Sequence, residues 1–311
     1  MIPPVLTFIV SLAVLVKSSD LFVKGASKLS TALNINPFVT GVLIVGLGTS
    51  LPELVSSIIA ALNNAPSIIS GNAVGSNIAN ILLVVGLAAI ISREINITHD
   101  ILKKDLPAVL VSVIVLYFTC EDRLIDKTET IILISMMIIY LALSGEKRTD
   151  ENRRATVPIT LGMILFVILP PIGIFLGAKY TVESVISIGS ALHISPGIIA
   201  LSAVSLGTSL PEIIVTIQAA RRGEGEIAIG NVTGSNIFNI FAVIGIPGLF
   251  GSFPVPEDIV SFSIPFLIAS TLLYIFIVLD KKIVLLEGFL MIAMYVYFLL
   301  RIFSITGQYS V

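Results

Sequence analysis

Two glutamates stand in identical company inside stretches of the chain that are otherwise apolar. The six residues GTSLPE occur twice and end at Glu53 and at Glu212. Thr49 and Thr208 precede them by about one helical turn, so in a helix each hydroxyl shares a face with a carboxylate. An ionised carboxylate among apolar groups is unfavourable unless it is paired, and neither stretch has Lys or Arg near the motif. A bound cation is therefore the simplest counter-charge.

A polar stripe follows each glutamate motif, in the sequences GNAVGSNIAN and GNVTGSNIFN. Asparagine or serine recurs at every fourth position, so these side chains lie on one face of a helix. The positions are Asn72, Ser76 and Asn80 in the first copy, and Asn231, Ser235 and Asn239 in the second. Carboxylate, hydroxyl, amide and carbonyl oxygens without His or Cys suit Ca2+ and Na+ better than zinc or copper.

Pro52 and Pro211 predict a break in each glutamate-bearing helix. Proline lacks an N–H and clashes with the carbonyl four residues earlier. The break is expected near Gly48, and at the equivalent glycine of the second copy, where it would free main-chain carbonyl oxygens for an ion. The hydroxyls of Ser50 and Ser209 are expected to bond back to their own helices.

The charge of such a site predicts exchange of ions. Two ionised glutamates would be neutralised by one Ca2+ or by two Na+, and a third Na+ would make the loaded site positive. An empty site would carry two unpaired charges past a dehydrated midplane, which should suppress the unloaded transition. Protons could also neutralise the pair, so H+ is a competing coupling ion on physical grounds alone.

The elements that must position these residues are membrane helices. The composition is 56% hydrophobic and 12% charged, and mean hydropathy is +1.05, so we expect a multi-pass protein of the cell membrane. Continuous apolar runs favour helices over a barrel. Ten transmembrane helices are expected, at roughly 3–30, 37–62, 69–91, 105–119, 127–144, 157–191, 196–220, 227–250, 259–279 and 284–304. Because Lys and Arg favour the cytoplasmic side, both the N-terminus and the C-terminus are placed outside.

An internal duplication organises the chain. A shift of 159 positions superposes residues 37–86 on residues 196–245 without a gap. The first five-helix half would be 1–144, the cytoplasmic linker 145–156, and the second half 157–311. Five helices separate the copies, so equivalent helices cross the membrane in opposite directions, as in the inverted repeats of secondary transporters.

These motifs resemble the two alpha-repeats of the cation/Ca2+ exchanger (CaCA) superfamily, and most closely its Na+/Ca2+ exchangers. The resemblance covers essentially the whole chain and implies electrogenic antiport of Ca2+ for Na+. Carried over residue by residue, it implies Ca2+ ligands at Glu53, Glu212, Thr49 and Thr208. For Na+ it implies these four with Ser76, Ser235 and the carbonyls of Gly46 and Ser205, and its central polar positions are Asn80 and Asn239. The long first and sixth helices are expected to slide as a pair.

Differences from related families limit the choice of ion that is exchanged for Ca2+. Relatives that also carry K+ depend on Asp at a central position, and this chain has Asn80 and Asn239, which argues against K+ co-transport. The proton-coupled branch usually has an acidic GNxxE pattern where this chain reads Gly75-Ser76-Asn77 and Gly234-Ser235-Asn236, which favours Na+ over H+. H+/Ca2+ and K+-dependent Na+/Ca2+ antiport stay as alternatives.

Other functional classes fit the residues less well. A cation channel could use the same oxygens. An intramembrane hydrolase would need a His-Glu metal motif or a nucleophile–base pair, and the sequence offers neither. No cofactor and no nucleic-acid partner is expected, since net charge is only -2 and basic residues are scattered; the single cysteine, Cys120, excludes an internal disulfide. The expected partners are Na+, Ca2+ and the lipid bilayer, with the oligomeric state left open.

Overall fold

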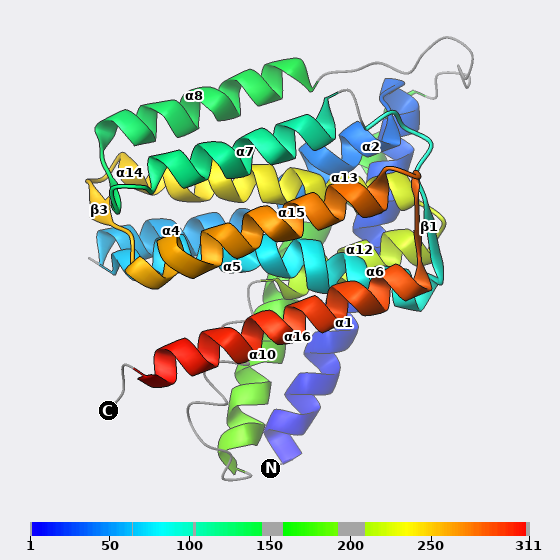
Figure 1. The fold of residues 1–311 in the computed structure, drawn as a ribbon. Coiled ribbons are helices and arrows are strands. Elements are labelled where there is room, and N and C mark those ends of the chain that lie inside the picture. Colours follow the sequence, from blue (N-terminus) through cyan, green and yellow to red (C-terminus); the bar gives the residue numbers. More distant parts are fainter. Residues whose placement is uncertain (1, 64, 102–103, 145–157, 192–208, 309–311) are drawn as a thin grey trace.

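A computed structural model describes residues 2–63, 65–101, 104–144, 158–191 and 209–308, and this part of the chain is almost entirely helical (Figure 1). The helices of the first half are α1 (Ile2–Leu33), α2 (Pro37–Thr40), η1 (Gly41–Gly46), α3 (Leu47–Thr49), α4 (Leu51–Leu62), α5 (Pro66–Ile78), η2 (Ala79–Val84), α6 (Val85–Ser92), α7 (Asp105–Thr119) and α8 (Lys127–Leu143). Those of the second half are α9 (Leu161–Ile168), α10 (Pro170–Ala191), α12 (Leu210–Arg221), α13 (Gly225–Phe238), η4 (Asn239–Ile244), α14 (Gly245–Gly248), η5 (Ile259–Ser263), α15 (Ile264–Val278) and α16 (Leu285–Gln308). The η segments are single π-helical turns inside longer helices.

Length and composition identify the membrane-crossing helices among the described residues. Six are long and apolar enough: Pro4–Leu33, Pro66–Ser92, Leu161–Ile188, Gly225–Gly248, Ile259–Val278 and Leu285–Ile302. The bent pair Pro37–Thr49 and Leu51–Leu62 would make a seventh. The protein is therefore a multi-pass protein of the cell membrane.

The helix that carries the first glutamate is broken, as the proline predicts. Its two parts meet at Ser50 with a bend of 42°, two residues beyond the predicted position at Gly48. Pro52 lies in the first turn of α4, where its missing N–H has no helical partner to lose. In the second half α12 begins at Leu210 with Pro211 in the same position. The expected break at Gly207 lies outside the described residues.

The predicted sixth helix is one span, Leu161–Ile188, with an interruption of a single residue that keeps helical dihedrals. α9 ends at Ile168 and α10 begins at Pro170, after a break at Leu169. A proline restricts the preceding residue and lacks an N–H, and here two prolines, Pro170 and Pro171, follow one another.

Two short antiparallel ribbons join the halves, which the sequence did not predict. β1 (Glu94–Asn96) pairs with β4 (Lys282–Val284), and β2 (Leu124–Ile125) pairs with β3 (Phe253–Pro254). The aligned residues are Glu94 with Val284 and Ile95 with Ile283 in one ribbon, and Ile125 with Phe253 and Leu124 with Pro254 in the other. The shift of 159 that relates the glutamate motifs converts one register into the other. The ribbons lie at opposite ends of the bundle (Figure 1), so the repeat extends well beyond the two motifs.

Helix α13 lies in the interior, and every residue from Ile227 to Phe238 is buried. Its glycines bring it backbone to backbone against the α2–η1 segment of the other half. A Cβ atom at Gly230 would lie 2.3 Å from the Phe38 carbonyl oxygen, and one at Gly234 would lie 2.4 Å from that of Val42. Small residues four apart permit this approach. The second polar stripe is thereby placed directly against the first glutamate-bearing segment.

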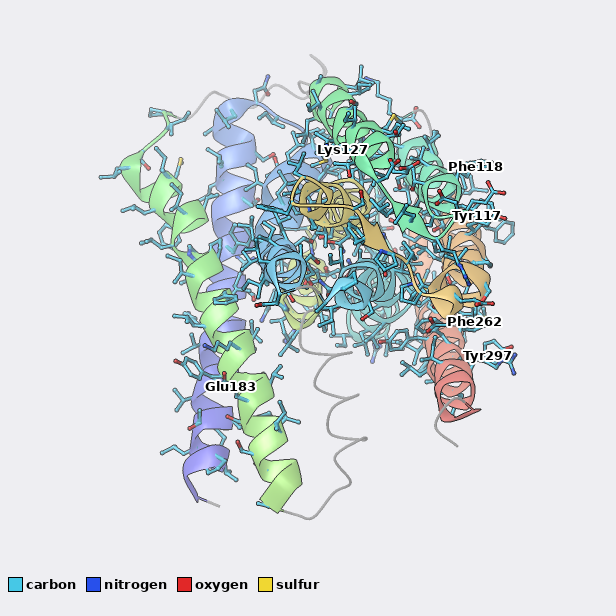
Figure 2. All side chains as sticks on the ribbon, turned by 90° about the vertical axis from the view of Figure 1, so that its left-hand side faces the viewer. Tyr117, Phe118, Lys127, Glu183, Phe262 and Tyr297 are labelled. Atoms are coloured by element: carbon cyan, nitrogen blue, oxygen red, sulfur yellow. The ribbon has the colours of Figure 1, made fainter. Side chains whose placement is uncertain are left out.

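Helices α1 and α10 form a long pair beside the remaining bundle (Figure 2). Thr181 Oγ1 donates to Ser11 Oγ at 2.9 Å between them. Near its middle α1 is tied to the bundle, because Arg222 Nη1 lies 2.7 Å from the Asp20 carboxylate. The predicted pairing of the two long helices is thus present, while their sliding stays a prediction.

Candidate functional site

The two motif glutamates are completely buried. Glu53 is 0% and Glu212 1% exposed, and each lies in the first turn of its helix, α4 or α12. The positive end of the helix dipole favours a carboxylate at this position by only about 0.3–1 kcal/mol, up to ~2 when partly buried. Among the described residues, neither oxygen of Glu53 and only one oxygen of Glu212 has a hydrogen-bond partner. Three buried carboxylate oxygens are therefore available to a cation.

Ser50 joins the two halves at this point. Its hydroxyl donates to Glu212 Oε1 at 3.0 Å, so the expectation that Ser50 bonds back to its own helix is wrong. The bend frees it: Ser50 lies between α3 and α4, with ψ of 4°, and belongs to neither helix. Since Ser50 is three residues before Glu53, the bond also places the two glutamates in one region. Ser209 is buried, and its hydroxyl has no partner in the described part of the chain.

Thr49 is the centre of an oxygen cluster built from both halves. Its Oγ1 lies 3.3 Å from the Gly46 carbonyl oxygen and 3.4 Å from Ser235 Oγ. Ser235 Oγ is in turn 3.2 Å from the same carbonyl. An octahedral shell at roughly 2.3–2.6 Å from the metal spaces neighbouring oxygens about 3.3–3.7 Å apart. The three oxygens are 3.2–3.4 Å apart and so lie close to the lower limit of the spacing on one face of such a shell.

A fourth oxygen completes the cluster. Asn231 Oδ1 lies 3.0 Å from Thr49 Oγ1, and the Asn231 amide nitrogen donates to Thr216 Oγ1 at 2.8 Å. Among the four clustered oxygens only the hydroxyls of Thr49 and Ser235 carry hydrogen. The cluster is therefore rich in lone pairs and poor in donors, which suits a hard cation.

The central asparagines are buried beside π-helical turns. Asn80 is 1% and Asn239 0% exposed; Asn80 lies in η2 and Asn239 begins η4. Neither amide has a hydrogen-bond partner among the described residues. The neighbouring Asn77 donates to the Asn236 main-chain carbonyl at 3.1 Å, which links the halves again. Single π turns occur frequently at functional sites, and sequence periodicity gave no sign of them.

The remaining predicted positions are only partly covered. Ser76 is buried at 4% exposure on α5. Thr208 and Ser205 lie outside the described residues. The structure does bring together Gly46, Thr49 and Ser235, three of the residues named for Na+, and their binding of Na+ stays a prediction. The sequence did not predict that Ser50 contacts Glu212 or that Thr216 contacts Asn231. A signal for Thr216 was present, because a hydroxyl residue follows each glutamate at about one helical turn, at Ser57 and at Thr216.

Comparisons with known proteins point to one family. The model of the sodium/calcium exchanger protein family matches residues 3–145 and 161–304. The chain is 35% identical to Sodium/calcium exchanger MaX1 of Methanosarcina acetivorans, over 96% of this chain and 98% of the relative. It is also 35% identical to an uncharacterized membrane protein of Methanocaldococcus jannaschii, over 93% and 94%.

A solved structure matches over nearly the full length. The sodium-calcium exchanger NCX_Mj, soaked with Na+ and Ca2+, superposes with a TM-score of 0.82 at 34% identity, covering 96% of this chain and 97% of that chain. NCX_Mj without either ion gives a TM-score of 0.84. Family model, full-length relatives and solved fold agree, and the chain belongs to the sodium/calcium exchanger family, in its prokaryotic branch.

Proposed function

We propose that this protein exchanges Na+ for Ca2+ across the cell membrane by alternating access. The observation that carries the proposal is the pair of buried glutamates with unpaired oxygens, adjoining a cluster of neutral oxygens. In this proposal Glu53, Glu212, Thr49 and Thr208 bind Ca2+. Na+ uses the same four with Ser76, Ser235 and the carbonyls of Gly46 and Ser205, while Asn80 and Asn239 line the centre.

Charge explains why the site would exchange ions rather than leak them. The carboxylates share a buried region with no Lys or Arg paired to them among the described residues. Closing the empty site would bury two unpaired negative charges, whereas one Ca2+ or two Na+ neutralise them. A third Na+ uses the neutral cluster around Thr49 and leaves the loaded site positive, so transport is electrogenic.

The proposed architecture is ten transmembrane helices in two inverted halves, with both termini outside. The halves are 1–144 and 157–311, with repeats 37–86 and 196–245 and the linker 145–156 in the cytoplasm. The related registers of the two ribbons support this arrangement, because equivalent strands lie at opposite ends of the bundle. Inverted halves give a site at the repeat interface two equivalent routes, one to each side.

Neutral central residues support coupling to Na+ without K+. Asn80 and Asn239 bring no further negative charge to the site. Among the described residues the buried acidic side chains are the two glutamates and Asp105, and Asp105 contacts His99 at 3.2 Å. Because one Ca2+ already balances the two glutamates, a K+ bound together with Ca2+ would lack a counter-charge.

The test is Ca2+ uptake by the purified protein in liposomes loaded with Na+. The outside solution contains Na+, choline or K+, and the membrane potential is either free or clamped with valinomycin and K+. We expect radioactive Ca2+ uptake to require the outward Na+ gradient and to be unchanged when choline replaces K+ in the absence of valinomycin. With valinomycin and an inward K+ gradient, which make the inside positive, uptake should accelerate. Glu53→Gln should abolish uptake, while the exposed carboxylate variant Glu257→Gln should retain it.

Three results would contradict the proposal. Uptake driven equally well by a proton gradient without Na+ would indicate an H+/Ca2+ antiporter. An absolute requirement for K+ would indicate a K+-dependent exchanger. Uptake without any counter-ion would indicate a channel.

A further inference from the structure

Asn231 connects the oxygen cluster to a second hydroxyl behind it. The side chain lies on α13 and is completely buried. Its Oδ1 accepts from Thr49 Oγ1 at 3.0 Å, and its Nδ2 donates to Thr216 Oγ1 at 2.8 Å. Both ends of the amide are thus occupied: the nitrogen points to Thr216 and the oxygen points to Thr49.

The orientation of this amide decides what Thr49 can offer to a cation. A threonine hydroxyl has one hydrogen and two lone pairs. When the hydrogen points to Asn231 Oδ1, both lone pairs remain for an ion beside the Gly46 carbonyl and Ser235 Oγ. A reversed amide would point N–H groups at Thr49, occupy a lone pair and place positive partial charge beside the ion.

The first half contains the same donor contact at equivalent positions. Asn72 Nδ2 donates to Ser57 Oγ at 3.3 Å, and also to the Glu53 main-chain carbonyl at 3.2 Å. Ser57 and Thr216 each lie one helical turn after a motif glutamate. The same donor direction therefore occurs in both copies of the repeat.

We propose that Asn231, held by Thr216, is a positioning residue for Na+. It takes the Thr49 hydrogen, so that Thr49 serves as an acceptor-only ligand in the cluster with Gly46 and Ser235. This inference rests on the proposed function, because it assumes that these oxygens bind Na+ during exchange. Ca2+ depends chiefly on the two carboxylates, neither of which Asn231 contacts in the described structure. Loss of the orientation should therefore weaken Na+ more than Ca2+.

Thr216→Val removes the acceptor that holds the amide and preserves the shape of the side chain. In Na+-dependent Ca2+ uptake we expect its KM for Na+ to rise about tenfold or more, the worth of one hydrogen bond to a charged group. The KM for Ca2+ and kcat should change by less than about threefold. Thr216→Ser retains the hydroxyl and should restore the Na+ KM. Thr233→Val, another buried threonine, which contacts Tyr274 rather than the cluster, controls for packing and should change neither KM.

Asn231→Asp supplies a second test that does not depend on the stability of Thr216→Val. A carboxylate presents oxygen to Thr49 in either orientation, so the Na+ KM should stay at or below the wild-type value. Adding Thr216→Val to Asn231→Asp should then have no further effect.

The inference is overturned if Thr216→Val leaves the Na+ KM unchanged, if it raises both KM values equally, or if Asn231→Asp raises the Na+ KM tenfold. Failure of wild-type protein to show Na+-dependent uptake is a different result, which refutes the proposed function itself.

Discussion

Replacing Glu53 by glutamine should weaken Ca2+ binding more than replacing Glu212 by glutamine. Both side chains are buried, but Ser50 occupies one oxygen of Glu212, whereas both oxygens of Glu53 are unpaired in the described structure. Glu53 can therefore bind Ca2+ through two oxygens and Glu212 through one, which is the ordinary choice between bidentate and monodentate carboxylates.

The magnitude follows from the loss of one partner of a buried charge pair. That loss costs about 3–5 kcal/mol, equivalent to roughly a 100- to 5,000-fold rise in the Kd for Ca2+. The second oxygen of Glu53 should contribute about 1.5 kcal/mol more to the free energy of Ca2+ binding than Glu212 does. The Glu53→Gln variant should therefore bind Ca2+ about tenfold more weakly than the Glu212→Gln variant.

Thermal unfolding of the purified protein in detergent measures Ca2+ binding without a transport assay. A ligand at about 100 times its Kd stabilises the folded state by roughly 2.7 kcal/mol, so wild type should show a Ca2+-dependent rise in Tm. Both glutamine variants should lose most of that rise. In ion-free buffer their Tm should equal or exceed that of wild type, because one of two neighbouring buried charges has been removed. The exposed variant Glu257→Gln should behave like wild type.

A Ca2+-dependent rise in Tm that survives in Glu53→Gln would refute the assignment of Ca2+ to this carboxylate. A larger loss in Glu212→Gln would refute the argument from Ser50. A lower Tm of Glu53→Gln in ion-free buffer would show that the glutamate has a structural partner.

Further predictions concern packing and ion selectivity. Gly234→Ala should destabilise the fold by about 1–3 kcal/mol, since its Cβ would lie 2.4 Å from a main-chain oxygen, whereas Gly162→Ala, with its nearest neighbour at 3.8 Å, should have little effect on Tm. Ile283→Ala in β4 should lower the free energy of unfolding by about 2–5 kcal/mol, because the Ile283 side chain is completely buried. Leu124→Ala, at the equivalent but exposed position of β2, should change it by no more than about 0.5 kcal/mol. Urea unfolding measures both values, and an equal loss at the two sites would contradict the prediction. Replacing K+ by choline on both sides should leave Na+-driven Ca2+ uptake unchanged, and a loss of uptake would contradict the role given to Asn80 and Asn239.

Local pattern and composition were enough to predict much of this protein. Continuous apolar runs predict membrane helices because hydrocarbon leaves no other partner for backbone groups. The duplicated acidic motif predicts a cation site because the cost of burying a carboxylate does not depend on the details of packing. Pro52 predicts a bend because its missing N–H acts within its own helix. The position of that bend was correct to within two residues.

Tertiary structure decided every feature that depends on contact between the halves. Ser50 and Glu212 are 162 residues apart in sequence, and Thr49 and Asn231 are 182 apart, so no local pattern predicts that they meet. The two ribbons contain only two or three residues per strand, too few for alternation to show in the sequence. The direction of the Asn231 amide likewise depends on which hydroxyl lies behind it. The residue types thus determine the chemistry that is available, while packing between the inverted motifs determines which oxygens are left free for an ion.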